Sequence, residues 1–294
     1  MAPSPNLFLS AAAEHTRKLH FGPLVYLLPF YQPLRLIEEI CMLDHLSGGR
    51  LEVGVGRGVS PFELGLHRIP FYDSRNVFHE ALEVVHRGLT SERLSFSGKY
   101  FHYENVPMEL RPLQQPHPDF WYGLLNEENA RYAAKFGMHS VVIGSTEACA
   151  KVIAAYRAAW KPNNPENLNE RVKSPKIGVQ RHAFIAETDK EAERIGRQAF
   201  QVFFRNINKL WNDFGTFTSV FPNDYEKVIE AGAFVIGSPS KVRDELARIA
   251  EVTKTNYLVQ VFSWGDLTGD QSRKSFDLFA SRVMPDLQKL SLAA

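Results

Sequence analysis

The sequence has few cysteines and almost no excess of charge. Cys41 and Cys149 are the only cysteines among its 294 residues, so neither a disulfide framework nor a thiolate metal site is indicated. Both lie in segments with a helical pattern, and we expect them to be buried free thiols. The 34 basic and 33 acidic residues leave a formal net charge of +1. This balance gives no reason to expect nucleic acid or an anionic membrane as a partner.

Long apolar runs are also missing. No stretch approaches the length of a transmembrane helix. The first residues, up to Lys18, lack the charged start and the apolar centre of a secretory signal. With 44% hydrophobic and 23% charged residues, the composition is that of a globular chain with ample apolar material for a core. We therefore expect a cytoplasmic protein.

Several catalytic motifs are absent as well. The histidines show no metal-ligand spacing such as His-Glu-x-x-His, and no Gly-x-Ser-x-Gly elbow or Cys/His pair indicates a nucleophile. His79 and His86 lie on one predicted helix, and His182 lies on a predicted strand from which it could reach the mouth of a barrel. A structural role is favoured for all three. The sequence predicts no metal site and identifies no catalytic residue.

The sequence does contain a regular alternation of helix and strand patterns. Apolar spacing predicts helices over 6–18, 33–46, 74–90, 127–136, 146–160, 189–211, 240–251 and 272–289. Apolar runs typical of buried parallel strands cover 19–29, 50–56, 119–125, 139–144, 176–188 and 256–265. A polar, proline-rich stretch over 95–118 is typical of a hairpin with a loop, and 214–234 is predicted to be irregular.

This alternation predicts an α/β fold with a parallel sheet. No change of composition marks a linker, which favours a single TIM-like barrel domain over residues 1–294 instead of two domains. Such a barrel has eight strands, whereas the sequence shows six. We therefore expect a barrel that lacks its first strand–helix–strand unit.

The most informative segment is the glycine loop that follows the strand over 50–56. Glycines let backbone amides approach a phosphate, and the guanidinium of Arg57 offers a fork of donors for its oxygens. The alternative is a tight strand exit with an exposed arginine. The segment Gly54–Gly58 does not match the dinucleotide fingerprint, which needs Gly-x-Gly-x-x-Gly and a later acid.

A second candidate for anion binding follows the strand over 119–125. Asn126 is a natural N-cap, and the free amides after it could face an anion. A simple capped helix is the alternative, because Glu127 and Glu128 would repel a phosphate that they faced. The aromatic segment Trp211–Phe221 fits a lid over an apolar ligand and fits ordinary packing equally well.

Several motifs along the whole chain resemble the bacterial luciferase-like flavin-dependent monooxygenases. They include Phe62-Glu63, Ser74-Arg75 and the aromatic strand FWYG. The longer ones are LDHLSGGRLEVGVGRG (43–58), ENARYAAKFG (128–137), GSPSKVRDELARIA (237–250) and FDLFASRVMPDL (276–287). The first of these motifs is specific to the family.

The resemblance implies a TIM-like barrel that is usually dimeric and binds its flavin at the carboxyl ends of the strands. The implied cofactor is reduced FMN, with a deazaflavin as an alternative. Reduced flavin and dioxygen would together oxidise a small organic substrate, and a flavin reductase is an implied partner. The resemblance also implies a homodimer or a higher homo-oligomer.

Matched position by position, the resemblance also implies which residues bind the cofactor. Arg57, followed by Gly58, resembles the arginine of the family that binds the flavin phosphate. Asn126 and Asn129 occupy the other phosphate-contacting positions, where the family often has serine and threonine. Leu24-Val25 falls where some members have a non-proline cis peptide beneath the flavin ring.

The start of the chain differs from the family pattern. Pro3-Ser4-Pro5-Asn6 resembles a point beyond the active-site histidine of the family, so we expect about fifty residues to be missing, the size of one strand–helix–strand unit. Leu19–Pro29 would then be an unpaired edge. Two functions stay open: an active flavin-dependent oxidoreductase, or an inactive flavin-binding or structural relic. A sugar- or nucleotide-phosphate isomerase is a third, without an acid/base pair to support it.

Overall fold

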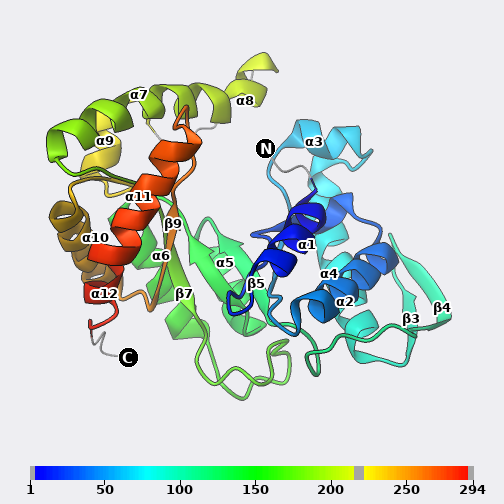
Figure 1. Ribbon diagram of the computed structural model, residues 1–294. Helices are drawn as coiled ribbons and strands as arrows, with labels where there is room; N and C mark the ends of the chain where they lie inside the picture. Colours follow the sequence, from blue (N-terminus) through cyan, green and yellow to red (C-terminus); the bar gives the residue numbers. More distant parts are fainter. Residues whose placement is uncertain (1–3, 215–221, 291–294) are drawn as a thin grey trace. The chain divides into compact units, whose positions relative to one another are not determined.

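The structure is a computed structural model that describes residues 4–214 and 222–290 (Figure 1). The contacts between residues divide the chain into two compact units. The first unit holds the chain up to Gly123, together with Lys135–His139 and Lys161–Lys173. The second holds Leu124–Ala134, Ser140–Trp160 and the chain from Ser174 onward. The prediction of a single domain over residues 1–294 stays a prediction.

The first unit contains three parallel strands in the order β1-β2-β5, with Val55 of β2 paired to Tyr26 and to Tyr122. Its elements are α1 (Pro5–His15), β1 (Tyr26–Leu27), the 3₁₀ helix η1 (Leu28–Phe30), α2 (Pro33–Ser47), β2 (Val53–Gly56), α3 (Pro61–Leu66), the 3₁₀ helix η2 (Phe71–Asp73), α4 (Ser74–Thr90), β3 (Arg93–Ser97), β4 (His102–Pro107) and β5 (Phe120–Leu124).

Helix α2 begins and ends where its sequence predicts. Pro33 occupies the first turn, where a missing N–H costs nothing, and the Gln32 side chain accepts a hydrogen bond from the Arg35 N–H. Gly48 ends the helix with φ 66°, a left-handed conformation that favours glycine. The helix predicted over 33–46 is confirmed, one residue longer than predicted.

The strand predicted over 19–29 is wrong in its extent. Strand pairing to the neighbouring segment is limited to a bridge between Phe21 and Leu51 and to the two residues of β1. Pro23 lies between them and has no N–H to donate to a neighbouring strand. The chain then turns into η1 at Leu28. Apolar character alone could not reveal this interruption, because the whole run is apolar.

The predicted hairpin is confirmed as the antiparallel pair β3–β4, which lies at the tip of the cyan region in Figure 1. The Glu80 carboxylate on α4 accepts hydrogen bonds from the backbone N–H groups of Lys99 and Tyr100, at 2.9 Å each. One side chain thus ties the turn of the hairpin to the helix.

A buried amide connects three separate stretches of the first unit. The Asn169 side chain accepts a hydrogen bond from the Phe120 N–H at 2.7 Å and donates to the Phe120 carbonyl at 2.9 Å. It also donates to the Gly137 carbonyl at 3.2 Å. Both main-chain groups of the first residue of β5 are therefore satisfied by a residue far along the chain.

The second unit is built around the long strand β7. Its elements are α5 (Glu127–Lys135), β6 (His139–Val142), α6 (Thr146–Ala159), β7 (Ile177–Ile185), α7 (Asp189–Ile207), α8 (Lys209–Asp213), α9 (Tyr225–Glu230), β8 (Phe234–Gly237), α10 (Pro239–Thr253), β9 (Tyr257–Val261), α11 (Gly269–Arg282) and α12 (Met284–Leu287). The first residue of β6 and the last of α5 belong by contacts to the first unit.

Strand β7 is paired in parallel on both edges. Gly178 pairs with Val141 of β6 and with Tyr257 of β9, so these two strands lie on opposite edges. His182 pairs with Val261 of β9 and with Phe234 of β8, so β8 lies on the same edge as β6, further along β7.

The prediction of six parallel strands is wrong, because the described residues contain seven. The additional strand, β8, begins at Phe234, the last residue of the segment predicted to be irregular, and continues over residues for which no element was predicted. Strand β8 is only four residues long and follows Gly232 closely. Such a short run does not stand out from the aromatic residues before it. The same segment also contains the short helix α9.

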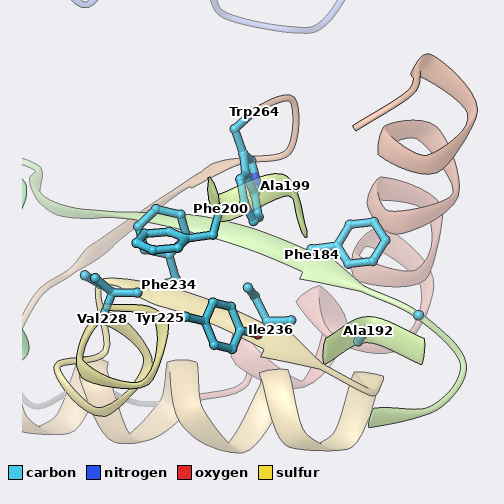
Figure 2. Close-up of a cluster of buried hydrophobic side chains, with 11 residues drawn as sticks. Phe184, Ala192, Ala199, Phe200, Tyr225, Val228, Phe234, Ile236 and Trp264 are labelled. Atoms are coloured by element: carbon cyan, nitrogen blue, oxygen red, sulfur yellow. The ribbon is translucent and has the colours of Figure 1, made fainter. Parts of the chain in front are cut away.

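The core of the second unit is an aromatic cluster between β8 and the helices α7 and α9 (Figure 2). The ring of Phe200 lies edge-on to that of Phe234, with centroids 5.3 Å apart. Trp264 packs on Phe234 and donates a hydrogen bond from Nε1 to the Ala183 carbonyl at 3.1 Å. Burial of these rings stabilises the contact between strand and helices.

The predicted α/β class with a mostly parallel sheet is confirmed. Within the two described ranges, no helix combines the length and the apolar character that a membrane span requires.

Candidate functional site

The glycine loop lies at the carboxyl end of β2, against the segment that precedes β1. An ideal Cβ on Gly54 would lie 2.1 Å from the Pro23 carbonyl oxygen, and one on Gly56 would lie 2.4 Å from Cγ2 of Val25. Neither distance is tolerated, so both positions require glycine. The Leu24–Val25 peptide bond is cis. These contacts place the predicted pair Leu24-Val25 against β2, whose last residue, Gly56, precedes Arg57.

Arg57 is half-buried, and its guanidinium is held in place. Nη1 donates a hydrogen bond to Oγ of Ser74 at 3.0 Å. The Phe71 ring lies next to the guanidinium, with 5.2 Å between Cζ and the ring centroid. In the part of the chain that the structure describes, Ser74 is the only hydrogen-bond acceptor of this side chain. The remaining N–H groups are free to bind an anion.

Gly58 follows with φ +82°, a conformation that L side chains rarely adopt. Its α-carbon faces Leu27 and Phe30, at 3.7–3.9 Å from an ideal Cβ. The Phe30 ring stacks on His67, with centroids 4.4 Å apart. The guanidinium of Arg57 is thus followed in the chain by a glycine that lies next to the apolar and aromatic side chains of Leu27 and Phe30.

The second candidate for anion binding lies in the other unit, at the start of α5. Oδ1 of Asn126 accepts a hydrogen bond from the Asn129 N–H at 2.9 Å, which confirms the predicted helix cap. Asn126 is exposed, as are Glu127 and Glu128. Its side-chain oxygen is therefore engaged by its own helix.

The structure groups the six predicted cofactor-binding residues by unit. Leu24, Val25, Arg57 and Gly58 lie together in the first unit, whereas Asn126 and Asn129 lie together in the second. Their binding of a cofactor stays a prediction.

His182 is buried in the aromatic cluster of the second unit. Its ring stacks on Phe234, with centroids 4.5 Å apart, and lies 4.6 Å from Phe203. Burial, with a smaller contribution from the neighbouring Arg181 charge, lowers the pKa of His182 to about 4. The side chain is neutral at pH 7, which supports the structural role predicted for it.

Both cysteines are free and buried, as predicted. Burial raises the pKa of the Cys41 thiol to about 11. Burial also raises the pKa of Cys149, although the Arg181 guanidinium lies 3.7 Å from its sulfur. Neither thiol is a nucleophile at neutral pH. Among residues 4–214 and 222–290, no group of three or more His, Cys, Asp or Glu side chains is arranged to hold a metal.

The proposed lid over Trp211–Phe221 lies mostly outside the described residues, since 215–221 are not described. Of its described part, Trp211 lies in α8 and is half-buried, and Phe214 is exposed. Its role as a lid stays a prediction.

The two residues that hold Arg57 were not predicted from the sequence. Ser74 and Phe71 are distant from it in sequence, so no local spacing relates them to it. The sequence contained one signal for Ser74: the pair Ser74-Arg75 is among the motifs that resemble the luciferase-like family.

The chain was compared with known proteins and solved structures. A family model described as "Luciferase-like monooxygenase" matches residues 1–255. The uncharacterized protein y4wF of Sinorhizobium fredii is 36% identical over 286 residues, which cover 96% of this chain and 82% of that protein. The monooxygenase RslO1 of Streptomyces bottropensis superimposes with a TM-score of 0.82 at 26% identity, over 97% of this chain and 84% of that one.

A further solved structure has the same fold. It is the oxygenating constituent of the 3,6-diketocamphane monooxygenase of Pseudomonas putida, a Type II Baeyer-Villiger monooxygenase in complex with FMN. It superimposes with a TM-score of 0.78 at 23% identity, over 99% of this chain and 85% of that one. Given the match across residues 1–255, this chain belongs to the luciferase-like monooxygenase family.

Proposed function

We propose that this protein is a flavin-dependent monooxygenase that uses reduced FMN and dioxygen to oxidise a small organic substrate. We also propose that Arg57, Gly58 and Leu24-Val25 bind the flavin. The predicted contribution of Asn126 and Asn129, which lie in the second unit, is a separate proposal. The observation that carries the proposal is the Arg57 guanidinium, fixed at the carboxyl end of β2 with N–H groups to spare. Membership of the family supports the reaction type.

The chemistry of the site fits the phosphate end of FMN. A phosphate dianion needs charge-assisted donors, and a guanidinium supplies them in a planar fork. The glycines at 54 and 56 allow Pro23 and Val25 to approach β2 closely, and Gly58 adopts the positive φ that the loop after Arg57 requires. When bound, reduced flavin supplies the two electrons with which dioxygen is activated.

The residues of the loop would bind and orient this cofactor. Arg57 would fix the phosphate and so set the position of the rest of the molecule. Leu24 is 46% exposed and offers apolar surface next to β2, suited to contact with an aromatic ring system. Asn126 would contribute through the amides at the start of α5, since its own oxygen caps that helix.

Two features of the proposal come from the family resemblance: the flavin reductase that would deliver reduced FMN, and the homodimer or higher homo-oligomer. A deazaflavin is the alternative cofactor. The relative in complex with FMN is the oxygenating constituent of its monooxygenase, which supports a separate reductase. The cytoplasmic location predicted from the sequence is also part of the proposal.

The first test is a titration of the purified chain with oxidised and then with reduced FMN, following flavin fluorescence and protein size together. We expect binding by a defined species, and loss of binding in Arg57→Ala. Arg35→Ala is the matched control, because Arg35 is an exposed arginine that pairs with Glu38 on α2. Unchanged affinity in Arg57→Ala would mean that the site is wrongly assigned.

Activity separates the enzyme from a flavin-binding relic. The chain with reduced FMN is mixed with a panel of small ketones, terpenes and phenols, and product formation is followed by mass spectrometry with ¹⁸O₂. Incorporation of one labelled oxygen atom into a product supports a monooxygenase. Flavin binding without labelled product from any substrate would favour the relic.

A further inference from the structure

Ser74 and Phe71 form a support for Arg57 that the proposed function does not include. Ser74 is the first residue of α4 and is completely buried. Its hydroxyl donates a hydrogen bond to the Phe71 carbonyl at 2.6 Å. The same oxygen accepts one from Nη1 of Arg57 at 3.0 Å. One side chain therefore joins the start of the helix to the arginine of the glycine loop.

The direction of these two hydrogen bonds matters. A hydroxyl has one proton, and the Phe71 carbonyl can only accept it. The proton of Ser74 is thus committed, and its lone pairs are left for a donor. A guanidinium can only donate, so the arrangement suits Arg57 and fixes which edge of the guanidinium faces the protein.

The Phe71 ring restricts the guanidinium further. It lies 5.2 Å from Cζ of Arg57 and attracts the cation through its π face. One N–H of the guanidinium is taken by Ser74, and the ring covers the cation. The edge that remains is the one available to a phosphate.

We propose that Ser74 is a positioning residue for FMN binding, which orients Arg57 toward the phosphate before the cofactor arrives, with Phe71 as its partner. This inference rests on the proposed function of Arg57. A side chain that is already ordered loses less freedom when it binds. Removing the Ser74 hydroxyl should therefore weaken binding of the phosphate group without weakening binding of the flavin ring.

The test compares FMN with riboflavin, which has the same ring and no phosphate. Affinities are measured by fluorescence titration for the wild type, Ser74→Ala, Ser74→Thr, Phe71→Leu and Arg57→Ala, and thermal melts establish that each variant is folded. We expect Ser74→Ala to weaken FMN binding about three- to tenfold and to leave riboflavin binding unchanged. Ser74→Thr, which keeps the hydroxyl, should restore the FMN affinity.

Phe71→Leu is the second variant, since Phe71 is 48% exposed and its replacement leaves the core intact. It should also weaken FMN selectively, by a smaller factor. Equal losses for FMN and riboflavin in Ser74→Ala would overturn the inference, because they would indicate a merely structural role. An unchanged FMN affinity would overturn it as well.

The variants also distinguish this inference from the proposed function. If Arg57→Ala weakens FMN binding and Ser74→Ala does not, only the positioning role fails. If Arg57→Ala has no effect, the phosphate site itself is wrong, and the positioning role fails with it.

Discussion

Both the loop after β2 in the first unit and strand β7 in the second carry basic side chains. The surroundings of these side chains differ. Arg57 is half-buried and is held by a serine and a phenylalanine, with N–H groups left over. Arg181 on β7 is completely buried and donates to the Cys149 sulfur and the Gln180 carbonyl. Its neighbour His182 is buried among aromatic rings.

A basic residue on or near a parallel strand is therefore not in itself a sign of a ligand site. Arg57 follows the last residue of its strand, where the chain is free to turn and expose the side chain. Arg181 and His182 lie within their strand, where both faces are covered by helices and side chains. Whether a basic side chain is available to a ligand or is packed in the core depends on where its residue lies along the strand. Substitutions in the two regions test this distinction.

The first prediction concerns the close approach of the chain at Pro23 to Gly54 of β2. Gly54→Ala would place a Cβ 2.1 Å from the Pro23 carbonyl oxygen, so backbone must move. We expect the free energy of unfolding to fall by about 3 kcal/mol, measured by denaturant unfolding. The matched control is Gly65→Ala in α3, where nothing lies within 4 Å of an ideal Cβ. That variant should be as stable as the wild type or slightly more stable.

The burial of His182 predicts a dependence of stability on pH. The pKa is about 4 in the folded chain and close to 6.5 when exposed, so the unfolded chain takes up the proton first as the pH falls. The contribution is complete above pH 6.5 and is lost progressively down to about pH 4. The total loss is about 3 kcal/mol.

Denaturant unfolding between pH 4 and 7 tests this in His182→Phe, which should lose less stability toward acid than the wild type. His102→Gln on the exposed hairpin is the control and should follow the wild type. Identical pH profiles for His182→Phe and the wild type would mean that folding does not lower the pKa of His182.

The affinity of Arg57 variants for FMN tests whether the guanidinium is available to the cofactor. A charge-assisted hydrogen bond contributes about 1.5–3 kcal/mol, so Arg57→Ala should weaken FMN binding roughly 10- to 100-fold. Arg57→Lys keeps the charge and loses the planar fork of donors. Its affinity for FMN should lie between those of the wild type and Arg57→Ala. The thermal stability of both variants should match the wild type. An affinity of Arg57→Lys equal to that of Arg57→Ala would indicate that charge contributes little.

The Asn126 cap gives the smallest effect. Its oxygen accepts from the Asn129 N–H, so Asn126→Ala should lower the free energy of unfolding by about 1 kcal/mol. Asn126→Asp should retain the stability, because aspartate caps equally well. If Asn126→Ala instead weakened FMN binding as strongly as Arg57→Ala at unchanged stability, the side chain would be a direct ligand.

Much of the fold follows from local patterns in the sequence. Helix α4 spans the predicted range from Ser74 to Thr90, and α2 ends within one residue of its predicted end, because periodicity and capping are local properties. Strand β8 was missed because four residues give too little pattern. The strand before residue 30 was overestimated because its apolar residues are partly interrupted by Pro23.

The candidate site could be predicted only in part. The glycines and Arg57 are adjacent in sequence, and their local chemistry indicates an anion site. The close approach of Val25 to Gly56 and the support of Arg57 by Ser74 depend on tertiary packing. No spacing in the sequence carries that information. The Asn126 cap is local again, and it was predicted correctly.

The amide of Asn169 has a consequence for how this protein could have been assembled from smaller pieces. The first unit is made of three stretches of chain, and Asn169 joins the other two through Phe120 and Gly137. A gene divided after residue 123 would separate β5 from the side chain that satisfies its first residue. A fragment that ended there would contain Phe120 of β5 without the partner for either of its main-chain groups.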